Sequence, residues 1–151
     1  MDVFGRYWLA DRTYSAGNWG HVSGPLVWTT QRAIYGADDE RVFQSQRYGN
    51  GGSFGYRFDV PNGTYEVELR FAEIYSRIDA PGQRVFDVEI EGQTVLNDLD
   101  VVAQADGQFR ALVRTFNALV GDERLNVTFA RDWQNGVDNP IINAIRVTRL
   151  D

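Results

Sequence analysis

The residues with the clearest chemical potential in this chain are aromatic side chains in segments with loop composition. Flat aromatic faces suit the C–H faces of pyranose rings, and a tyrosine adds a hydroxyl group that can bond to sugar oxygens. Each ring could instead fill a gap at the edge of a hydrophobic core, so no single aromatic residue is decisive. As a set they are candidates for a saccharide-binding surface. The members are Trp19, Tyr48, Tyr75 and Trp133.

Two carboxylates stand out beside these rings. Asp138 lies in the loop Gly-Val-Asp-Asn-Pro, where a carboxylate can accept hydrogen bonds from sugar hydroxyl groups, and charge-assisted bonds are the stronger kind. Its alternative role is an Asx turn ahead of Pro140. Glu73 continues the inward face of a predicted strand, where a charge is unusual. We expect Glu73 to be tied to backbone amides or to an arginine and to support the shape of the loop.

Glu73 and Asp138 could also be nominated as the carboxylate pair of a small glycosidase, because such enzymes need two carboxylates at a set spacing. The sequence does not set their separation, and a catalytic cleft normally needs more chain around it. A catalytic role would predict product release from polysaccharide that is lost in Glu73→Gln. We therefore expect a protein that is not an enzyme.

Strict alternation of apolar and polar residues predicts several short strands. The turn signal Pro61-Asn62-Gly63 separates two of them, which predicts a β-hairpin. The start of its first strand and the end of its second would then lie together, so Tyr48 and Tyr75 are expected at the same end of the hairpin. The predicted strands cover residues 4–9, 54–60, 64–71, 86–90, 94–96, 109–119, 125–129 and 142–147.

This pattern of many short strands joined by loops indicates an all-β fold of the β-sandwich type. No helix longer than one or two turns is expected. A chain of 151 residues is large enough for one hydrophobic core, so we expect a single domain over residues 1–151.

Composition excludes several classes of function. The net charge of −6 argues against a nucleic-acid-binding protein. The absence of cysteine excludes disulfides, thiol catalysis and cysteine-ligated metal, and His21, the single histidine, disfavours a histidine-based metal site or catalytic triad. No cofactor is expected. A structural calcium ion near the acidic loops stays an open alternative, although no ligand spacing supports it.

Membrane association is not expected either. No apolar run approaches the ~18 residues of a membrane span. The N-terminal stretch MDVFGRYWLADRTY lacks the basic and apolar regions of a signal peptide.

Four segments together resemble the malectin family. They are FQSQRYG (43–49), GTY through FAEIY (63–75), RVFDV (84–88) and DNP through NAI (138–145). The resemblance covers nearly the whole chain and is closest to the bacterial malectin-like domains classed as carbohydrate-binding module family 57. It implies a galactose-binding-like β-sandwich of the jelly-roll type and non-catalytic carbohydrate binding.

Carried over by motif, the resemblance assigns ligand contacts to Tyr48, Tyr75 and Asp138, and more loosely to Trp19. The ligand that it implies is a short α-linked glucose oligosaccharide. One departure is Ser76, which stands where the family has a second aromatic residue. This change removes a stacking surface, for which Trp133 could compensate.

We therefore expect a carbohydrate-binding, lectin-like module that recognises an oligosaccharide or polysaccharide. The resemblance implies that it accompanies the catalytic domains of a larger protein, such as a secreted glycoside hydrolase, at an extracellular or cell-surface location. The alternative is a structural or protein-interaction module within a larger assembly. A groove lined with aromatic residues would favour the first function, and a flat apolar patch the second.

Overall fold

The computed structural model describes residues 7–151, which contain eleven strands and two short helices. The strands are β1 (Trp19–Val22), β2 (Leu26–Thr29), β3 (Ser45–Tyr48), β4 (Phe54–Asp59), β5 (Gly63–Phe71), β6 (Phe86–Ile90), β7 (Gln93–Leu99), β8 (Leu112–Val120), β9 (Arg124–Ala130), β10 (Ile141–Ile142) and β11 (Ala144–Arg149). The helices are α1 (Glu40–Phe43) and α2 (Val101–Ala105).

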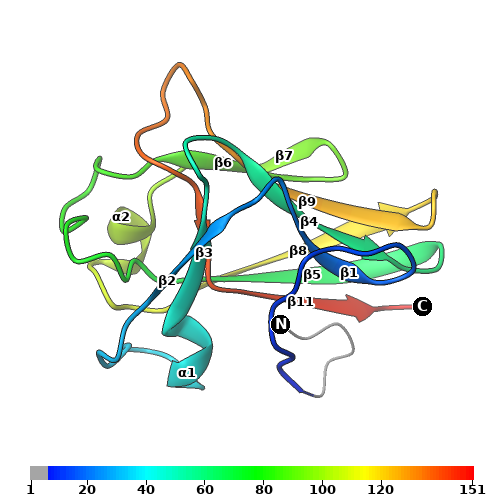
Figure 1. Ribbon diagram of the computed structural model, residues 1–151, viewed down its shortest axis with the longest axis horizontal. Helices are drawn as coiled ribbons and strands as arrows, with labels where there is room; N and C mark the ends of the chain where they lie inside the picture. The colour runs from blue at the N-terminus through cyan, green and yellow to red at the C-terminus, as the bar shows by residue number, and fades with distance from the viewer. Residues whose placement is uncertain (1–6) are drawn as a thin grey trace.

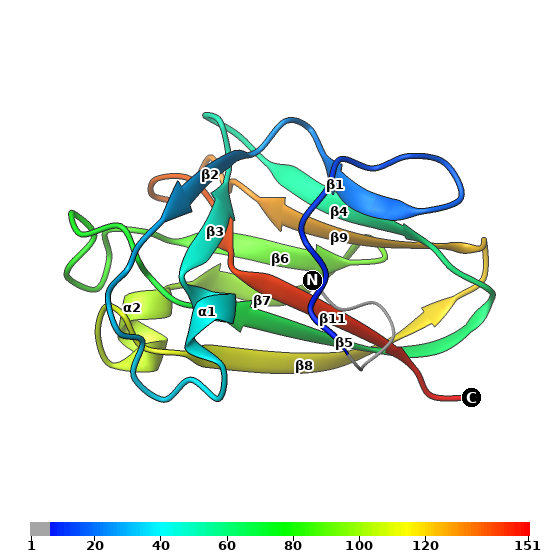
Figure 2. The same cartoon turned by 60° about the horizontal axis from the view of Figure 1, so that its bottom comes forward.

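Three antiparallel sheets make up the molecule (Figures 1 and 2). A five-stranded sheet in the order β1-β4-β9-β6-β7 and a three-stranded sheet in the order β11-β5-β8 form the two layers of a sandwich. A second three-stranded sheet, β10-β3-β2, lies across one end. The prediction of an all-β sandwich is confirmed.

The alternating residues of both large sheets meet in one core. On β5, Val67, Leu69 and Phe71 are fully buried, because period-two alternation sends every second side chain inward. Phe71 joins the layers, since its ring lies 6.1 Å from that of Phe86 and 6.4 Å from that of Phe129 on the other sheet. Burial of each such ring contributes roughly 1.5–3 kcal/mol.

The predicted hairpin of residues 54–60 and 64–71 is wrong. β4 pairs with β1 and β9, whereas β5 pairs with β11 and β8. The segment between β4 and β5 therefore crosses from one layer to the other, and both strands turn their apolar side chains toward the shared core. The chain still reverses direction there, so the start of β4 and the end of β5 lie at the same end of the sandwich (Figure 2).

Two other predictions concern the ends of the chain and the helices. Of the strand predicted for residues 4–9, residues 4–6 lie outside the described range and residues 7–9 form no strand. The helices have four and five residues, and the side chains of Asp39 and Asp100 cap their N-termini. The prediction that no helix exceeds one or two turns is confirmed for the described residues. In residues 7–151, neither helix has the length or the apolar character needed to span a membrane.

Asn143, between β10 and β11, ties the end sheet to the sandwich. Its Nδ2 donates to the carbonyl oxygens of Phe43 and Ser45 at 2.9 and 3.0 Å, and its Oδ1 accepts from the backbone N–H of Ala72 at 2.9 Å. One side chain thus holds the chain just before β3 against the chain just after β5. These are the strands that lead to Tyr48 and Tyr75.

Asn143→Ala is expected to lower the free energy of unfolding by about 2–4 kcal/mol, since it removes these hydrogen bonds at roughly 1 kcal/mol each and leaves backbone groups unpaired. Urea denaturation measures the change. Asn97→Ala is the control, because Asn97 is exposed and, within residues 7–151, its side chain bonds only to Asp98, at 3.2 Å. A loss no larger than that of the control would mean that Asn143 is not a structural tie.

His21 gives the fold a distinctive pH response. Its ring packs edge-on against Tyr56 at 6.2 Å, and its Nδ1 is buried without a hydrogen-bond partner among the described residues. Burial, followed by the positive charge of Arg47, lowers the pKa of His21 below 6.5. The unfolded chain therefore binds the proton more readily than the folded domain does.

The stabilising effect of the neutral His21 ring is present above the unfolded pKa and is lost as the pH falls through the lower folded pKa. We expect the unfolding free energy to decrease between about pH 7.5 and 5.5, and to decrease less in His21→Phe. Denaturant titrations of both proteins across this range measure the difference. Equal pH dependence of the two proteins would contradict the assignment.

Candidate functional site

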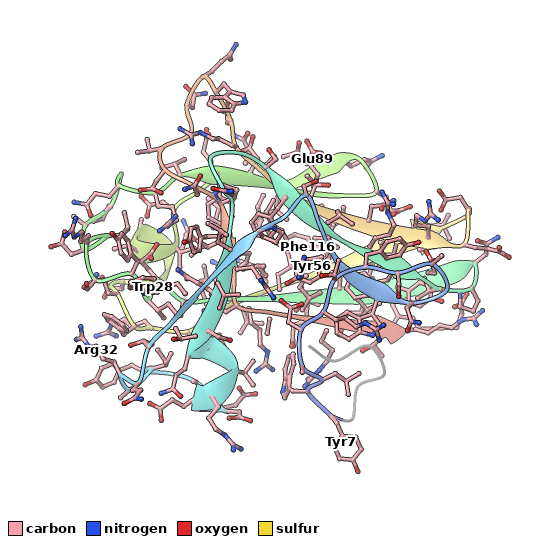
Figure 3. All side chains as sticks on the ribbon, in the orientation of Figure 1. Tyr7, Trp28, Arg32, Tyr56, Glu89 and Phe116 are labelled. Atoms are coloured by element: carbon pink, nitrogen blue, oxygen red, sulfur yellow. The ribbon has the colours of Figure 1, made fainter. Side chains whose placement is uncertain are left out.

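A pocket of about 280 Å³ lies at the end of the sandwich where the third sheet meets two long loops. In both ribbon views the loops before β6 and after β9 converge on this end, beside β2 and β3 (Figures 1 and 2). Figure 3 shows Trp28 at the same end. The pocket is lined by Trp28, Gln46, Tyr48, Tyr75, Arg84, Asp138 and Asn139.

The strands β2 and β3 supply one wall of the pocket. Trp28 lies directly opposite Gln46 in the antiparallel register, and Tyr48 follows two residues after Gln46. Residues two apart on a strand share a face, so Gln46 and Tyr48 point to the same side. Gln46 is 3% exposed, whereas Trp28 is 41% exposed. The wall therefore has a buried amide at its base and an accessible indole at its rim.

The loop after β5 supplies the opposite wall. The Tyr75 ring meets the Trp28 ring edge-on, with centroids 5.2 Å apart and planes at 86°. The Nε2 of Gln108 holds this loop by donating to the carbonyl oxygens of Tyr75, Ser76 and Ile78 at 3.3, 3.0 and 2.6 Å. Perpendicular rings leave a corner that a flat ligand can occupy.

A buried ion pair forms the back of the pocket. Glu73 is fully buried, and its Oε2 accepts from Arg84 Nε at 2.6 Å. Its Oε1 accepts from the backbone N–H of Tyr75 at 3.1 Å. Burial raises the pKa of Glu73, and the Arg84 guanidinium opposes that shift. The carboxylate predicted on the inward face of the strand thus binds both an arginine and the loop backbone.

Arg84 extends this network to the loop that carries Asp138. Its terminal NH1 lies 3.4 Å from Asp138 Oδ1 and also donates to the carbonyl oxygen of Asn139. The neighbouring residues Val85 and Val137 exchange backbone hydrogen bonds at 2.9 and 3.0 Å. Both loops are therefore fixed to each other on either side of the pocket.

The backbone conformation of Asp138 leaves its carboxylate accessible at the pocket mouth. Its φ is 62°, in the left-handed region that Asp and Asn tolerate better than most residues. Its Oδ1 accepts from the backbone N–H of Asn139 at 2.6 Å, and the Asn139 side chain accepts from Gly51 N–H at 3.1 Å. The bond from Asp138 reaches only the next residue, whereas an Asx turn needs the backbone N–H two residues on, which Pro140 lacks, so the Asx turn considered from the sequence is not formed. The side chain of Asp138 is 39% exposed at the pocket mouth.

Taken together, the pocket combines three aromatic side chains with a carboxylate, a buried amide and a guanidinium whose charge is already balanced. Such a surface can stack on a ring and bond to several hydroxyl groups. The comparison that decides the family is a match of the malectin-domain model to residues 2–145.

The chain belongs to the malectin domain family.

Relatives of this malectin domain occur in much longer proteins. Receptor-like protein 4 of Arabidopsis thaliana is 41% identical over 96 residues, which cover 63% of this chain and 15% of that protein. Malectin-B of Xenopus laevis is 42% identical over 67 residues, which cover 42% of this chain and 22% of that protein. This chain therefore spans less than a quarter of the length of either relative.

A solved structure shares the fold over almost the entire domain. The crystal structure of a Bacteroides uniformis β-glucuronidase matches with a TM-score of 0.81 and 30% sequence identity. The match covers 95% of this chain and 16% of the β-glucuronidase chain. The malectin domain is thus equivalent to one part of that enzyme chain.

The structure brings some of the predicted site residues together and separates others. Tyr48, Tyr75 and Asp138 line the one pocket. Trp19 does not line this pocket, because its ring is 7% exposed and stacks on Phe58 in the core. Trp133 is 74% exposed beneath the Arg131 guanidinium and does not line the pocket.

Four pocket residues were missed by sequence reasoning. Trp28 was not among the aromatic candidates, although the run Leu26-Val27-Trp28 is strand-like and forms most of β2. Gln46 and Arg84 lie inside the motifs that carried the resemblance, and Asn139 follows Asp138 directly. Their polar side chains gave no signal beyond their motif.

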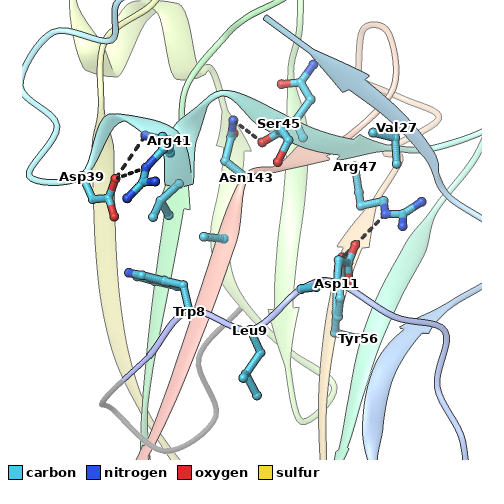
Figure 4. A pocket seen from close by; sticks show the side chains of 14 residues that line it. Trp8, Leu9, Asp11, Val27, Asp39, Arg41, Ser45, Arg47, Tyr56 and Asn143 are labelled. Atoms are coloured by element: carbon cyan, nitrogen blue, oxygen red, sulfur yellow. Dashed lines mark hydrogen bonds and ion pairs between the residues drawn. The ribbon is translucent and has the colours of Figure 1, made fainter. Parts of the chain in front are cut away.

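A larger groove of about 560 Å³ is lined on one side by residues 8–11 (Figure 4). Its central polar residue is already engaged, since Asp11 accepts from Arg47 Nε at 2.6 Å and from the Tyr56 hydroxyl at 2.8 Å. The Trp8 ring at its edge lies 4.8 Å from the Arg70 guanidinium. The smaller pocket, with its accessible aromatic faces, is the better candidate for a ligand site.

One acidic cluster in the described residues has ligand-like spacing. Asp87, Asp98 and Asp132 place one carboxylate oxygen each within 4.8 Å of one another. Asp87 Oδ1 also accepts from the backbone N–H of Asp98 at 2.7 Å. These carboxylates do not line the aromatic pocket.

Proposed function

We propose that this domain is a non-catalytic carbohydrate-binding module, of the kind classed as family 57 in bacteria, and that its ligand occupies the pocket. The aromatic faces of Trp28, Tyr48 and Tyr75 pack on a sugar ring. The carboxylate of Asp138 accepts hydrogen bonds from sugar hydroxyl groups. The observation that carries this proposal is the convergence of these four side chains, from four separate parts of the chain, on a single concave site.

The size of the pocket supports a short saccharide unit as the bound portion. Its volume of about 280 Å³ is near the lower end of the roughly 300–1,000 Å³ typical of small-molecule sites. Stacking contacts of about 0.5–1.5 kcal/mol each and a charge-assisted bond of about 1.5–3 kcal/mol are reduced by ordering costs. The expected dissociation constant is roughly micromolar to millimolar.

The same geometry argues against glycoside hydrolysis. Both oxygens of Glu73 are occupied by Arg84 and by the Tyr75 backbone, and the side chain is fully buried. A general acid or nucleophile must reach the scissile bond. Glu73 therefore acts as a support for the loop, and Asp138 has no second free carboxylate beside it in the pocket lining.

The relatives support a proposal for the cellular context. A β-glucuronidase and a receptor-like protein each contain an equivalent domain within a much longer chain. We place this domain likewise beside other domains of a parent protein, at an extracellular or cell-surface location. Its role there is to hold a saccharide close to its neighbours.

Isothermal titration of the domain with soluble glucans, xylans, galactans and pectic oligomers tests the proposal. One or more of these saccharides should bind, and Tyr75→Ala should weaken that binding at least several-fold without lowering the unfolding temperature by more than a few degrees. The proposal fails if no saccharide gives heat or a spectroscopic change.

The alternative function, a protein-interaction module, has one feature in its favour. Strand β2 is the edge of its sheet in the described chain, and Leu26, Val27 and Trp28 on it are all more than 40% exposed. Exposed apolar strand edges are sites of pairing with other chains. Loss of self-association or partner binding in Val27→Lys, with saccharide binding absent in the parent domain, would favour this second function.

A further inference from the structure

Gln46 is a buried polar side chain whose hydrogen bonding is incomplete. It is 3% exposed, and its Oε1 has no hydrogen-bond partner among the residues that the structure describes. An unpaired buried acceptor costs roughly 1–3 kcal/mol. In a well-packed domain such a group requires an explanation.

The position of Gln46 connects this unpaired amide with the candidate site. It lines the pocket together with Tyr48 and Trp28, and strand alternation puts its side chain on the same face of β3 as Tyr48. Gln46 also borders the larger groove, but Ser45 and Arg47, which point to the opposite face of β3, form that part of the groove. Its amide therefore belongs to the aromatic pocket.

The polar groups that surround Gln46 have other partners, so its Oε1 stays unpaired within residues 7–151. Arg84 is engaged by Glu73, Asp138 and the Asn139 carbonyl oxygen. The indole opposite Gln46, that of Trp28, faces the Tyr75 ring at 5.2 Å. A terminal amide offers both a donor and an acceptor, and it can rotate about its last side-chain bond.

We propose that Gln46 is a specificity-determining residue of the pocket, which bonds to one hydroxyl group of the bound saccharide through its amide. Binding supplies the partner that Oε1 lacks in the free domain. A sugar without that hydroxyl group leaves the amide unpaired and binds more weakly. This inference rests on the proposed carbohydrate-binding function.

The decisive variant is Gln46→Met, which has a similar length and volume but no amide. The first measurement is thermal unfolding without ligand. Because the buried Oε1 has no partner among the described residues, Gln46→Met should unfold at the same temperature as the parent or at a higher one. A clearly lower unfolding temperature would show that the amide is a structural group and would overturn the inference.

The second measurement is titration with maltose, cellobiose, xylobiose, galactobiose and digalacturonate. The affinity for whichever disaccharide binds the parent domain should fall roughly 5- to 30-fold in Gln46→Met. Gln93→Met, an exposed glutamine of β7, is the matched control and should bind as the parent does. Binding by Gln46→Met within two-fold of the parent would overturn the inference while leaving the proposed function intact.

Monodeoxy analogues of the bound disaccharide identify the hydroxyl group. One analogue should bind the parent domain more weakly but lose no further affinity in Gln46→Met, since the same bond is missing in both cases. Equal losses for every analogue in both proteins would contradict the assignment. If neither the five disaccharides nor the soluble polysaccharides bind the parent, the proposed function and this inference both fail.

Discussion

Replacing Arg84 by methionine is expected to lower the free energy of unfolding by about 3–5 kcal/mol, the cost of leaving a buried charge without its partner. Arg84 is the partner of the fully buried Glu73 at 2.6 Å, and it also contacts Asp138 and the Asn139 carbonyl oxygen. Without it the Glu73 carboxylate must either stay unpaired or take up a proton. Chemical denaturation at neutral pH measures the loss.

A double substitution separates charge pairing from packing. In Glu73→Gln combined with Arg84→Met, no charge is left unpaired, so the double variant should be more stable than the sum of the single losses predicts. Arg77→Met, an exposed arginine in the same loop, should change stability by no more than about 0.5 kcal/mol. If Arg84→Met resembles Arg77→Met, the ion pair does not support the pocket.

Replacing Asp138 by glycine is expected to weaken saccharide binding by roughly 10- to 100-fold, which corresponds to the loss of a charge-assisted hydrogen bond. Glycine is chosen because the φ of 62° at this position would strain an alanine. Asp138→Asn retains an acceptor and tolerates the same backbone, so its loss should be smaller. Titration calorimetry compares the three proteins.

The same loop offers a control for the Asp138 variants. Trp133→Ala removes a large aromatic ring that is 74% exposed and does not line the pocket, so its affinity should stay within two-fold of the parent. A strong loss in Trp133→Ala together with normal binding by Asp138→Gly would move the ligand out of the pocket. It would also restore the role that the sequence suggested for Trp133.

Alternation along the chain was sufficient to predict the strands but not the sheets to which they belong. The runs that became β4, β5, β6 and β9 were recognised because every second residue is apolar. The same alternation serves a strand in either layer of a sandwich, since both layers face one core. The turn at Pro61 therefore suggested a hairpin where the chain instead crosses between layers.

The candidate site was predictable where a motif carried it and not where only tertiary packing defines it. Tyr48, Tyr75 and Asp138 were named from motifs and line one pocket, and their role in binding stays a prediction. Trp19 was misplaced because its glycine-containing neighbourhood has loop composition, whereas pairing of β1 with β4 puts its ring over Phe58. Trp28 was missed because only the pairing of β2 with β3 brings it opposite Gln46.

The four tryptophans provide the most direct test of the central claim, which is that the ligand binds in the pocket bordered by Trp28. Each occupies a different environment: Trp8 at the larger groove, Trp19 in the core, Trp28 in the pocket and Trp133 on an exposed loop. A ¹H–¹⁵N spectrum resolves the indole N–H signal of each one, and single Trp→Phe variants assign them.

Titration of the labelled domain with a saccharide that it binds should shift the Trp28 indole signal most, in proportion to the fraction of domain occupied. The signals of Trp8, Trp19 and Trp133 should move little. Saturable shifts of the Trp8 or Trp133 signal with that of Trp28 unchanged would place the ligand at the groove or on the loop, and would contradict binding in the aromatic pocket.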